Sequence, residues 1–244
     1  MADLLLVHGA WHGAWCWDEL IPELEARGHS ARAVDLPGMG QDETPAAEAS
    51  LAAYAGRVAE AVKAAAGKVW LVGHSMGGAS ITQAGEWAAD RLAGIVYVTA
   101  GLPLNGQAFF DAVAPSEPTR LQQVLVMDQA AGAGRVPPEH LKACFYHLCS
   151  DAQVERARRL LREWQPFAPA ATPVVVTEAN YGRVPRYYVE CLQDEGIPIA
   201  VQRRMHKAAG VREVATLDTD HSPFFSCPGE LAAAIDGFTL RPPG

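Results

Sequence analysis

A serine, a histidine and an aspartate occur in the order and the local contexts that nucleophilic catalysis requires. Ser75 lies in GHSMG, residues 73–77, directly after an apolar run and directly before a helical pattern. A serine between two such glycines, leaving a strand for a helix, predicts a nucleophile elbow, a tight turn that exposes the hydroxyl group. A glycine-rich structural turn is the alternative interpretation of the same residues.

Because a serine hydroxyl is a weak nucleophile near neutral pH, Ser75 needs a base. Of the eight histidines, His221 follows the last strand-like run, which predicts a position at the carboxyl edge of a parallel sheet, where ligands bind. Asp194 follows the preceding run and completes the chain order serine, aspartate, histidine. We predict Ser75 as nucleophile, His221 as base and Asp194 as the acid that orients the base. A solvated loop histidine and a loop-capping carboxylate are the alternatives.

The first strand-like run ends in His8, Gly9 and Ala10, and this loop can supply part of an oxyanion hole. In sites of this kind, one backbone N–H comes from such a loop and the other belongs to the residue after the nucleophile. We therefore predict the N–H groups of Ala10 and Met76 as the oxyanion donors. The missing side chain of Gly9 lets the loop approach closely.

Alternating strand-like and helical patterns predict the elements that must position these residues. Apolar runs occur at residues 4–8, 31–36, 69–73, 94–99, 186–191 and 212–217. Helical patterns separate them at residues 17–27, 51–62, 75 onward and 228–238, the second with Ser50 as its N-cap. This alternation predicts an α/β fold with a mostly parallel sheet of about six strands flanked by helices.

One long segment interrupts the alternation. Residues 105–181 have helical patterns at 138–148 and 151–164 but no clear pair of strands. We predict a core formed by residues 1–104 and 182–244, with residues 105–181 as an inserted helical cap. A substrate pocket is expected between the cap and the sheet edge. Its candidate contacts are Gly9, Trp11, His12, Phe109, Phe145 and Phe224, with Phe110, Leu125 and Met127 as further lining candidates, and core packing is the alternative for each.

Composition excludes several classes of function. The 244 residues carry a net charge of -8, which makes the protein a poor candidate for binding nucleic-acid phosphates, and the arginines at 156, 158, 159 and 162 are predicted to form a solvated helix face. No apolar run reaches the length that spans a membrane. The five cysteines are odd in number and include no CxxC pair, which favours reduced thiols. Because a strand pattern begins at residue 4, we expect no signal peptide and a cytoplasmic protein that binds neither nucleic acid nor membrane.

Five motifs together resemble the α/β-hydrolase superfamily, in particular the branch of plant methylesterases, plant hydroxynitrile lyases and bacterial esterase relatives. They are HGAWHGAWCW at 8–17, GHSMGG at 73–78, FYHLCS at 145–150, CLQDEGIP at 191–198 and DHSP at 220–223. The resemblance implies the same catalytic residues and oxyanion donors as above. It also implies no cofactor and no metal, and in many members a homodimer.

Two departures from the lyases of this branch bear on the reaction. Gly9 stands where the closest plant lyases have threonine, and Ser222 stands where they have the lysine that holds the departing cyanide. Ester hydrolysis needs no such cation. We therefore expect a serine carboxylesterase that hydrolyses small to medium apolar esters through an acyl-enzyme. A hydroxynitrile lyase-like enzyme and a weakly catalytic, receptor-like ligand-binding protein remain the alternatives, whereas dehalogenase and epoxide hydrolase chemistry would place an aspartate at Ser75.

Overall fold

Six strands form one parallel sheet in the computed structural model, which describes residues 1–241. The strand order is β2-β1-β3-β4-β8-β9, and every neighbouring pair is parallel. The strands are β1 (Asp3–Val7), β2 (Ser30–Val34), β3 (Val69–His74), β4 (Leu92–Val98), β8 (Arg186–Cys191) and β9 (Glu213–Leu217). Each of them overlaps one of the six predicted runs, so the predicted fold class is confirmed.

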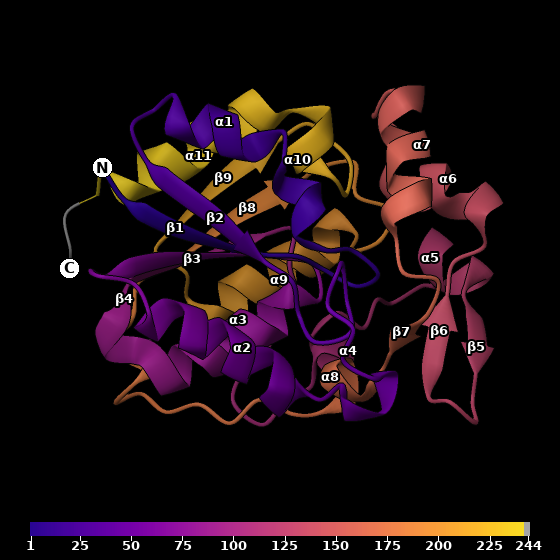
Figure 1. The fold of residues 1–244 in the computed structure, drawn as a ribbon, viewed down its shortest axis with the longest axis horizontal. Helices are drawn as coiled ribbons and strands as arrows, with labels where there is room; N and C mark the ends of the chain where they lie inside the picture. Colours follow the sequence, from indigo (N-terminus) through magenta and orange to yellow (C-terminus); the bar gives the residue numbers. More distant parts are fainter. Residues whose placement is uncertain (242–244) are drawn as a thin grey trace.

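Helices cover both faces of this sheet (Figure 1). Alternate residues of β1 face opposite layers: Leu5 and Val7 pack in one core cluster, and Leu4 and Leu6 pack in the other. The first layer contains α2 (Leu51–Lys63), α3 (Gly77–Ala88) and α9 (Ile199–Ala209). The second contains α1 (Leu20–Glu25), α10 (Pro223–Ser226) and α11 (Pro228–Thr239). Because both faces are covered, the central strands are apolar throughout.

Parallel strands bring distant loops to one edge of the sheet. The loops after β1, β3, β8 and β9 hold Ala10, Ser75, Asp194 and His221, respectively. Since the carboxyl ends of parallel strands lie at the same edge, these four residues meet although up to 211 positions separate them in the printed sequence.

The segment between β4 and β8 contains both helices and strands. Its helices are α4 (Phe109–Ala112), α5 (Arg120–Val124), α6 (Leu141–Phe145), α7 (Asp151–Leu160) and α8 (Ala168–Ala171). It also holds a three-stranded antiparallel sheet of β5 (Val126–Asp128), β6 (Ala133–Arg135) and β7 (Gln165–Pro166), which the sequence analysis did not predict. These strands are two or three residues long, too short to show an alternating pattern. Short 3-10 turns occur at Ala14–Trp17, Ala46–Glu48, Ala89–Arg91, Pro138–His140 and Tyr181–Arg183.

The two ends of this segment pack on the core rather than apart from it. Helix α8 lies against α2 and α3, and Ala170 and Val174 belong to the core cluster of that face. Residues 119–167, which we call the cap, stand beside the sheet edge and carry α5, α6, α7 and the small sheet (Figure 1). In residues 1–241, no helix is both long enough and apolar enough to cross a membrane.

Candidate active site

Ser75 occupies a strained turn between β3 and α3. Its φ is +52°, a left-handed conformation that non-glycine residues rarely adopt. The flanking glycines make room for it, because a Cβ on Gly77 would lie 2.5 Å from the carbonyl oxygen of His8 and a Cβ on Gly73 2.5 Å from the side chain of Ile81. The glycine spacing of the motif is therefore a steric requirement of this turn.

The serine, histidine and aspartate side chains form a continuous hydrogen-bonded chain. His221 Nε2 lies 3.1 Å from Ser75 Oγ, and His221 Nδ1 lies 2.7 Å from Asp194 Oδ2. Asp194 and His221 are both buried, at 6% and 3% exposure, so water does not screen their contact. When the Nδ1–H group of His221 donates this hydrogen bond to the carboxylate, Nε2 carries no proton and is free to accept the one from serine.

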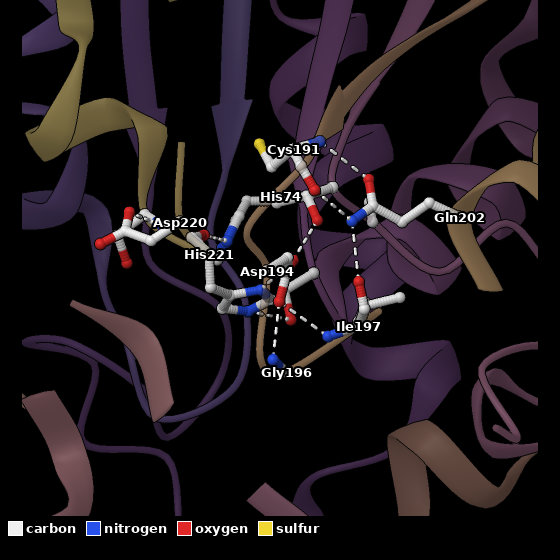
Figure 2. Close-up of polar contacts among 12 residues, drawn as sticks. His74, Cys191, Asp194, Gly196, Ile197, Gln202, Asp220 and His221 are labelled. Carbon is white, nitrogen blue, oxygen red and sulfur yellow. Dashed lines mark hydrogen bonds and ion pairs between the residues drawn. The ribbon is translucent and has the colours of Figure 1, made fainter. Parts of the chain in front are cut away.

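The Asp194 carboxylate is held by donors on every side. Its Oδ1 accepts hydrogen bonds from the N–H groups of Gly196, at 2.6 Å, and Ile197, at 2.8 Å, and its Oδ2 also accepts one from the Thr99 hydroxyl. Figure 2 shows these two backbone nitrogens turned toward the carboxylate, opposite the His221 ring. These donors fix the orientation of the carboxylate that accepts from His221.

Gln202 of α9 closes the loop that carries Asp194. Its side chain accepts from the Cys191 N–H at 3.0 Å and donates to the carbonyls of Cys191 and Ile197 at 3.1 and 2.7 Å (Figure 2). The amide is fully buried, so each of these contacts replaces one that water would otherwise make. The loop between residues 191 and 197 is thus pinned at both ends.

The two expected oxyanion donors border the same space. Ala10 and Met76 both line the cavity above Ser75. Within residues 1–241, neither of their N–H groups donates to a protein acceptor. Backbone N–H groups in a folded protein are normally paired, so two unpaired ones beside Ser75 are suited to an oxygen that gains negative charge.

Three buried histidines brace the catalytic loops. His8 Nδ1 lies 2.8 Å from the Gly9 carbonyl, His12 Nδ1 2.7 Å from the Ala10 carbonyl, and His74 Nε2 2.8 Å from the His221 carbonyl. A carbonyl only accepts, so in each case the imidazole donates. Burial lowers the pKa of His12 to about 3 and also lowers the pKa of His8 and of His74. All three rings are therefore neutral near neutral pH.

Backbone strain within residues 1–241 is concentrated here. The only non-glycine residues with positive φ are Trp11, Ser75 and Thr99, at +62°, +52° and +36°. Trp11 is fixed by its N–H to Gln165, at 3.0 Å, and by its indole N–H to the Gly134 carbonyl, at 2.9 Å. Strained conformations persist where surrounding contacts over-determine them, which is typical of functional sites.

An apolar cavity of about 100 Å³ lies over Ser75 and His221, between the sheet edge and the cap. Four of the predicted contact residues line it, as do two of the further lining candidates: Trp11, His12, Phe109, Phe145, Phe110 and Leu125. None of the lining residues is an aspartate, glutamate, lysine or arginine.

Three of the predicted pocket residues do not line this cavity. Phe224 is fully buried behind the site, with its ring 5.0 Å from that of His74 and 5.4 Å from that of Trp17. Gly9 lies beneath Ser75, where a Cβ would come within 2.7 Å of the serine Cβ, so it contacts the nucleophile rather than the cavity. Met127 is on β5 and is 52% exposed.

Sequence reasoning missed several residues of the site. The additional lining residues come from α5 and its flanks, from the second half of the cap and from the aspartate loop: Val113, Thr119, Leu121, Gln122, Gln165, Phe167, Gly196 and Ile197. For the lining residues between 113 and 167, the sequence supports only the prediction of a cap, because single positions within the cap follow no recognisable spacing. Gly196 and Ile197 lie outside that predicted cap. Thr99, which follows β4 directly, could have been found from its place at the carboxyl edge.

The residues that the structure describes contain no candidate metal site. Within residues 1–241, no group of three or more histidine, cysteine, aspartate or glutamate side chains is arranged to hold a metal ion. The five cysteines are all free thiols, and four of them are buried.

Comparisons with known proteins agree with the observed fold. The chain is 34% identical to a pyrethroid hydrolase of Sphingobium wenxiniae, covering 99% of this chain and 89% of that protein. It is 35% identical to methylesterase 7 of Arabidopsis thaliana, covering 95% and 94%. The crystal structure of a pyrethroid hydrolase from Sphingobium faniae superposes with a TM-score of 0.87 at 31% identity, covering 99% and 98% of the two chains.

A family model described as the alpha/beta hydrolase family matches residues 4–234, which include the loops that hold Ala10, Ser75, Asp194 and His221 and all of the large sheet except the first residue of β1. The predicted superfamily is confirmed by this match and by the relatives. The protein belongs to the alpha/beta hydrolase family.

Proposed function

We propose that this protein is a serine carboxylesterase that hydrolyses neutral, apolar esters of small to medium size through an acyl-enzyme. The observation that carries the proposal is the hydrogen-bonded chain of Ser75, His221 and Asp194 opening into an apolar cavity. The names of the two curated relatives, a pyrethroid hydrolase and a methylesterase, support ester hydrolysis as the reaction.

The geometry supports a two-step mechanism. Ser75 Oγ attacks the ester carbonyl while His221 Nε2 takes its proton, and the Asp194 carboxylate stabilises the imidazolium. The N–H groups of Ala10 and Met76 bind the oxyanion. His221 then protonates the leaving alcohol. In the second step His221 takes a proton from the water molecule that attacks the acyl-enzyme, and it returns this proton to Ser75 Oγ as the carboxylic acid departs.

The cavity favours neutral substrates. Its polar side chains are engaged with the protein itself: the Gln165 carbonyl accepts from the Trp11 N–H, and Thr119 and Gln122 cap each other across the start of α5. Since no aspartate, glutamate, lysine or arginine of the described residues lines the cavity, an ionised acyl or alcohol group would lose its hydration without gaining a partner.

The position after His221 supports hydrolysis over cyanohydrin cleavage. Ser222 is fully buried, and its hydroxyl has no hydrogen-bond partner among residues 1–241. No lysine or arginine lines the cavity, so a departing cyanide anion would meet no cation there.

The proposal is tested with a panel of 4-nitrophenyl and methyl esters of increasing acyl length, assayed on the wild type and on Ser75→Ala. Ser80→Ala is the matched control, since Ser80 is a buried serine of α3. We expect hydrolysis by the wild type and by the Ser80 variant, and loss of more than about 1,000-fold in kcat on removal of the nucleophile. Undiminished turnover by Ser75→Ala would contradict the proposal. Cyanide release from a cyanohydrin such as mandelonitrile, if faster than ester cleavage, would point to the lyase. Tight ligand binding without turnover would point to a receptor-like protein.

A further inference from the structure

A short turn of the cap contacts both catalytic loops. Residues 146–149 follow α6, and the Cys149 N–H donates to the Tyr146 carbonyl at 3.0 Å to close the turn. This turn lies in FYHLCS, a motif of the sequence for which the proposed mechanism has no role. Phe145 of this motif lines the substrate cavity, but neither Tyr146 nor Cys149 does, so substrate contact does not account for the turn.

The first contact reaches the oxyanion loop through a histidine. Tyr146, which is fully buried, places its hydroxyl 2.6 Å from His12 Nε2. Because His12 donates through Nδ1 to the Ala10 carbonyl at 2.7 Å and its ring is neutral, Nε2 must accept, and the tyrosine hydroxyl is the donor.

This chain of hydrogen bonds fixes the peptide group that follows Ala10. The peptide group that precedes Ala10, and that carries the proposed donor N–H, is fixed by the bond from His8 to the Gly9 carbonyl. Both peptide planes that meet at Ala10 are thus held, one from the sheet and one from the cap. The two planes share the Cα atom of Ala10, so a shift of the second plane would displace this Cα and with it the Ala10 N–H, which must lie close to the developing oxyanion.

The second contact reaches the histidine loop through Asp220. Its carboxylate is fully buried, and its Oδ2 accepts from the Leu148 N–H at 2.8 Å and lies 3.6 Å from the Cys149 thiol. Its Oδ1 accepts from the Ser222 N–H and the Ser226 hydroxyl, both at 3.0 Å. Figure 2 shows the Asp220 side chain turned away from the His221 ring, so it does not orient the imidazole directly.

We propose that the 146–149 turn is a positioning element of the active site, with Tyr146 holding the oxyanion loop through His12 and Asp220 holding the loop of the catalytic histidine against the cap. The inference rests on the proposed ester hydrolysis and adds two positioning residues to it. It also assigns this part of the cap a role in the rate of the chemical step, separate from substrate binding.

Substitutions of Tyr146 and of Asp220 should change the kinetics in different ways, and the dependence of kcat/KM on the leaving group distinguishes them. A 4-nitrophenolate leaves without protonation, whereas an alkoxide needs the proton that His221 delivers. Acylation is therefore compared through kcat/KM for 4-nitrophenyl butanoate and ethyl butanoate, which share the acyl group. Tyr146→Phe weakens oxyanion binding for both esters, so kcat/KM should fall by the same factor, roughly ten-fold, for each. The fall should come from kcat, with KM little changed. Asp220→Asn misplaces His221, so the ethyl ester loses roughly ten-fold more than the aryl ester.

Matched variants control for general loss of packing. Tyr97→Phe removes another fully buried tyrosine hydroxyl, which bonds Thr82 and Tyr181 away from the site. Glu190→Gln neutralises another buried carboxylate, which bonds Arg203, His206 and Thr216. Both controls are expected to lower the melting temperature and to leave kcat and the aryl-to-alkyl ratio unchanged.

The outcomes separate the inference from the proposed function. If Ser75→Ala is inactive while Tyr146→Phe and Asp220→Asn keep the kcat and the ratio of their controls, the positioning role is wrong and the esterase stands. If Ser75→Ala keeps its activity, the proposed function itself is wrong. If Asp220→Asn melts below the assay temperature, Tyr146→Phe alone decides, because it removes only the hydroxyl oxygen. A kcat for Tyr146→Phe equal to that of Tyr97→Phe would then overturn the inference.

Discussion

His74 donates a hydrogen bond of 2.8 Å from its imidazole to the backbone carbonyl of His221, and the two rings lie 4.6 Å apart. The residue before the proposed nucleophile thus supports the residue that serves as the proposed base. The neutral state of the supporting ring is essential to this arrangement, because a second cation so close would oppose formation of the imidazolium at His221.

The buried histidines make the folded protein sensitive to acid. Burial keeps the pKa of His8, His12 and His74 below the ordinary value of 6.5, to about 3 for His12, whereas in the unfolded chain they titrate near 6.5. The unfolded state therefore binds more protons below that pH. The free energy of unfolding should fall as the pH drops below about 7, by up to about 1.4 kcal/mol per pH unit for His12, and protonation of His8 and His74 should add to the loss in the same direction.

Urea denaturation at pH 7.5, 6.0 and 5.0 measures this loss of stability. His12→Asn, which keeps a donor but does not titrate, should reduce the slope by the share of one histidine. A free energy of unfolding that does not change over this range would show that these rings are protonated in the folded state.

Removing the hydroxyl of Thr99 tests the support of the catalytic carboxylate. Thr99→Val deletes one donor to Asp194 and keeps the shape of the side chain, while the N–H groups of Gly196 and Ile197 remain. We expect kcat to fall by roughly ten-fold with KM nearly unchanged. Thr82→Val is the control, since the Thr82 hydroxyl is also buried but bonds Tyr97. Equal activities of the two variants would contradict a role of Thr99 in holding the carboxylate.

The elbow glycines should not tolerate a methyl group. In Gly77→Ala the new Cβ would lie 2.5 Å from the His8 carbonyl oxygen, which forces the nucleophile loop away from the oxyanion loop. A displacement of this size is expected to lower kcat by roughly 100-fold. Gly56→Ala is the reference, because its Cβ has open space inside α2, and it should raise the free energy of unfolding by about 0.5–1 kcal/mol without a change in kcat. Steady-state kinetics and thermal melts of both variants decide between these outcomes.

The aromatic side chains of the cavity wall should select among substrates. Phe110 is 42% exposed and packs edge-to-face on Phe167 at 5.5 Å, and both line the cavity. Phe110→Ala should raise KM for aryl esters by roughly 2- to 10-fold, the worth of one aromatic contact, and leave KM for methyl esters of short acids unchanged. If both ester classes respond equally, substrate does not bind against this pair.

Much of the fold and the candidate site could be predicted because the decisive signals are local. Each strand of the large sheet is a short apolar run, and the rule that parallel strands end at one edge brings Ser75, Asp194 and His221 together. The glycines around Ser75 predict the turn because only a missing Cβ fits there. The predicted cytoplasmic location, the homodimer and the division into a core and an inserted domain stay predictions.

The remaining features depend on tertiary contacts that leave no local pattern. The hydrogen bond from Tyr146 to His12 joins residues 134 positions apart. Phe224 was predicted as a candidate pocket residue with core packing as the alternative, and its ring packs on those of His74 and Trp17. Strands as short as β7, with two residues, gain their pairing only from the sheet that they join.

The central claim is that the Ser75 hydroxyl, activated by His221, is the nucleophile. The most direct test inactivates the protein with a 4-nitrophenyl alkylphosphonate and locates the adduct by peptide mass, in the wild type and in His221→Ala. The account predicts one adduct per chain, on Ser75, forming in step with loss of esterase activity and at least about 100-fold more slowly without the histidine. An adduct on another residue that tracks the loss of activity, or full activity in protein labelled at Ser75, would contradict it.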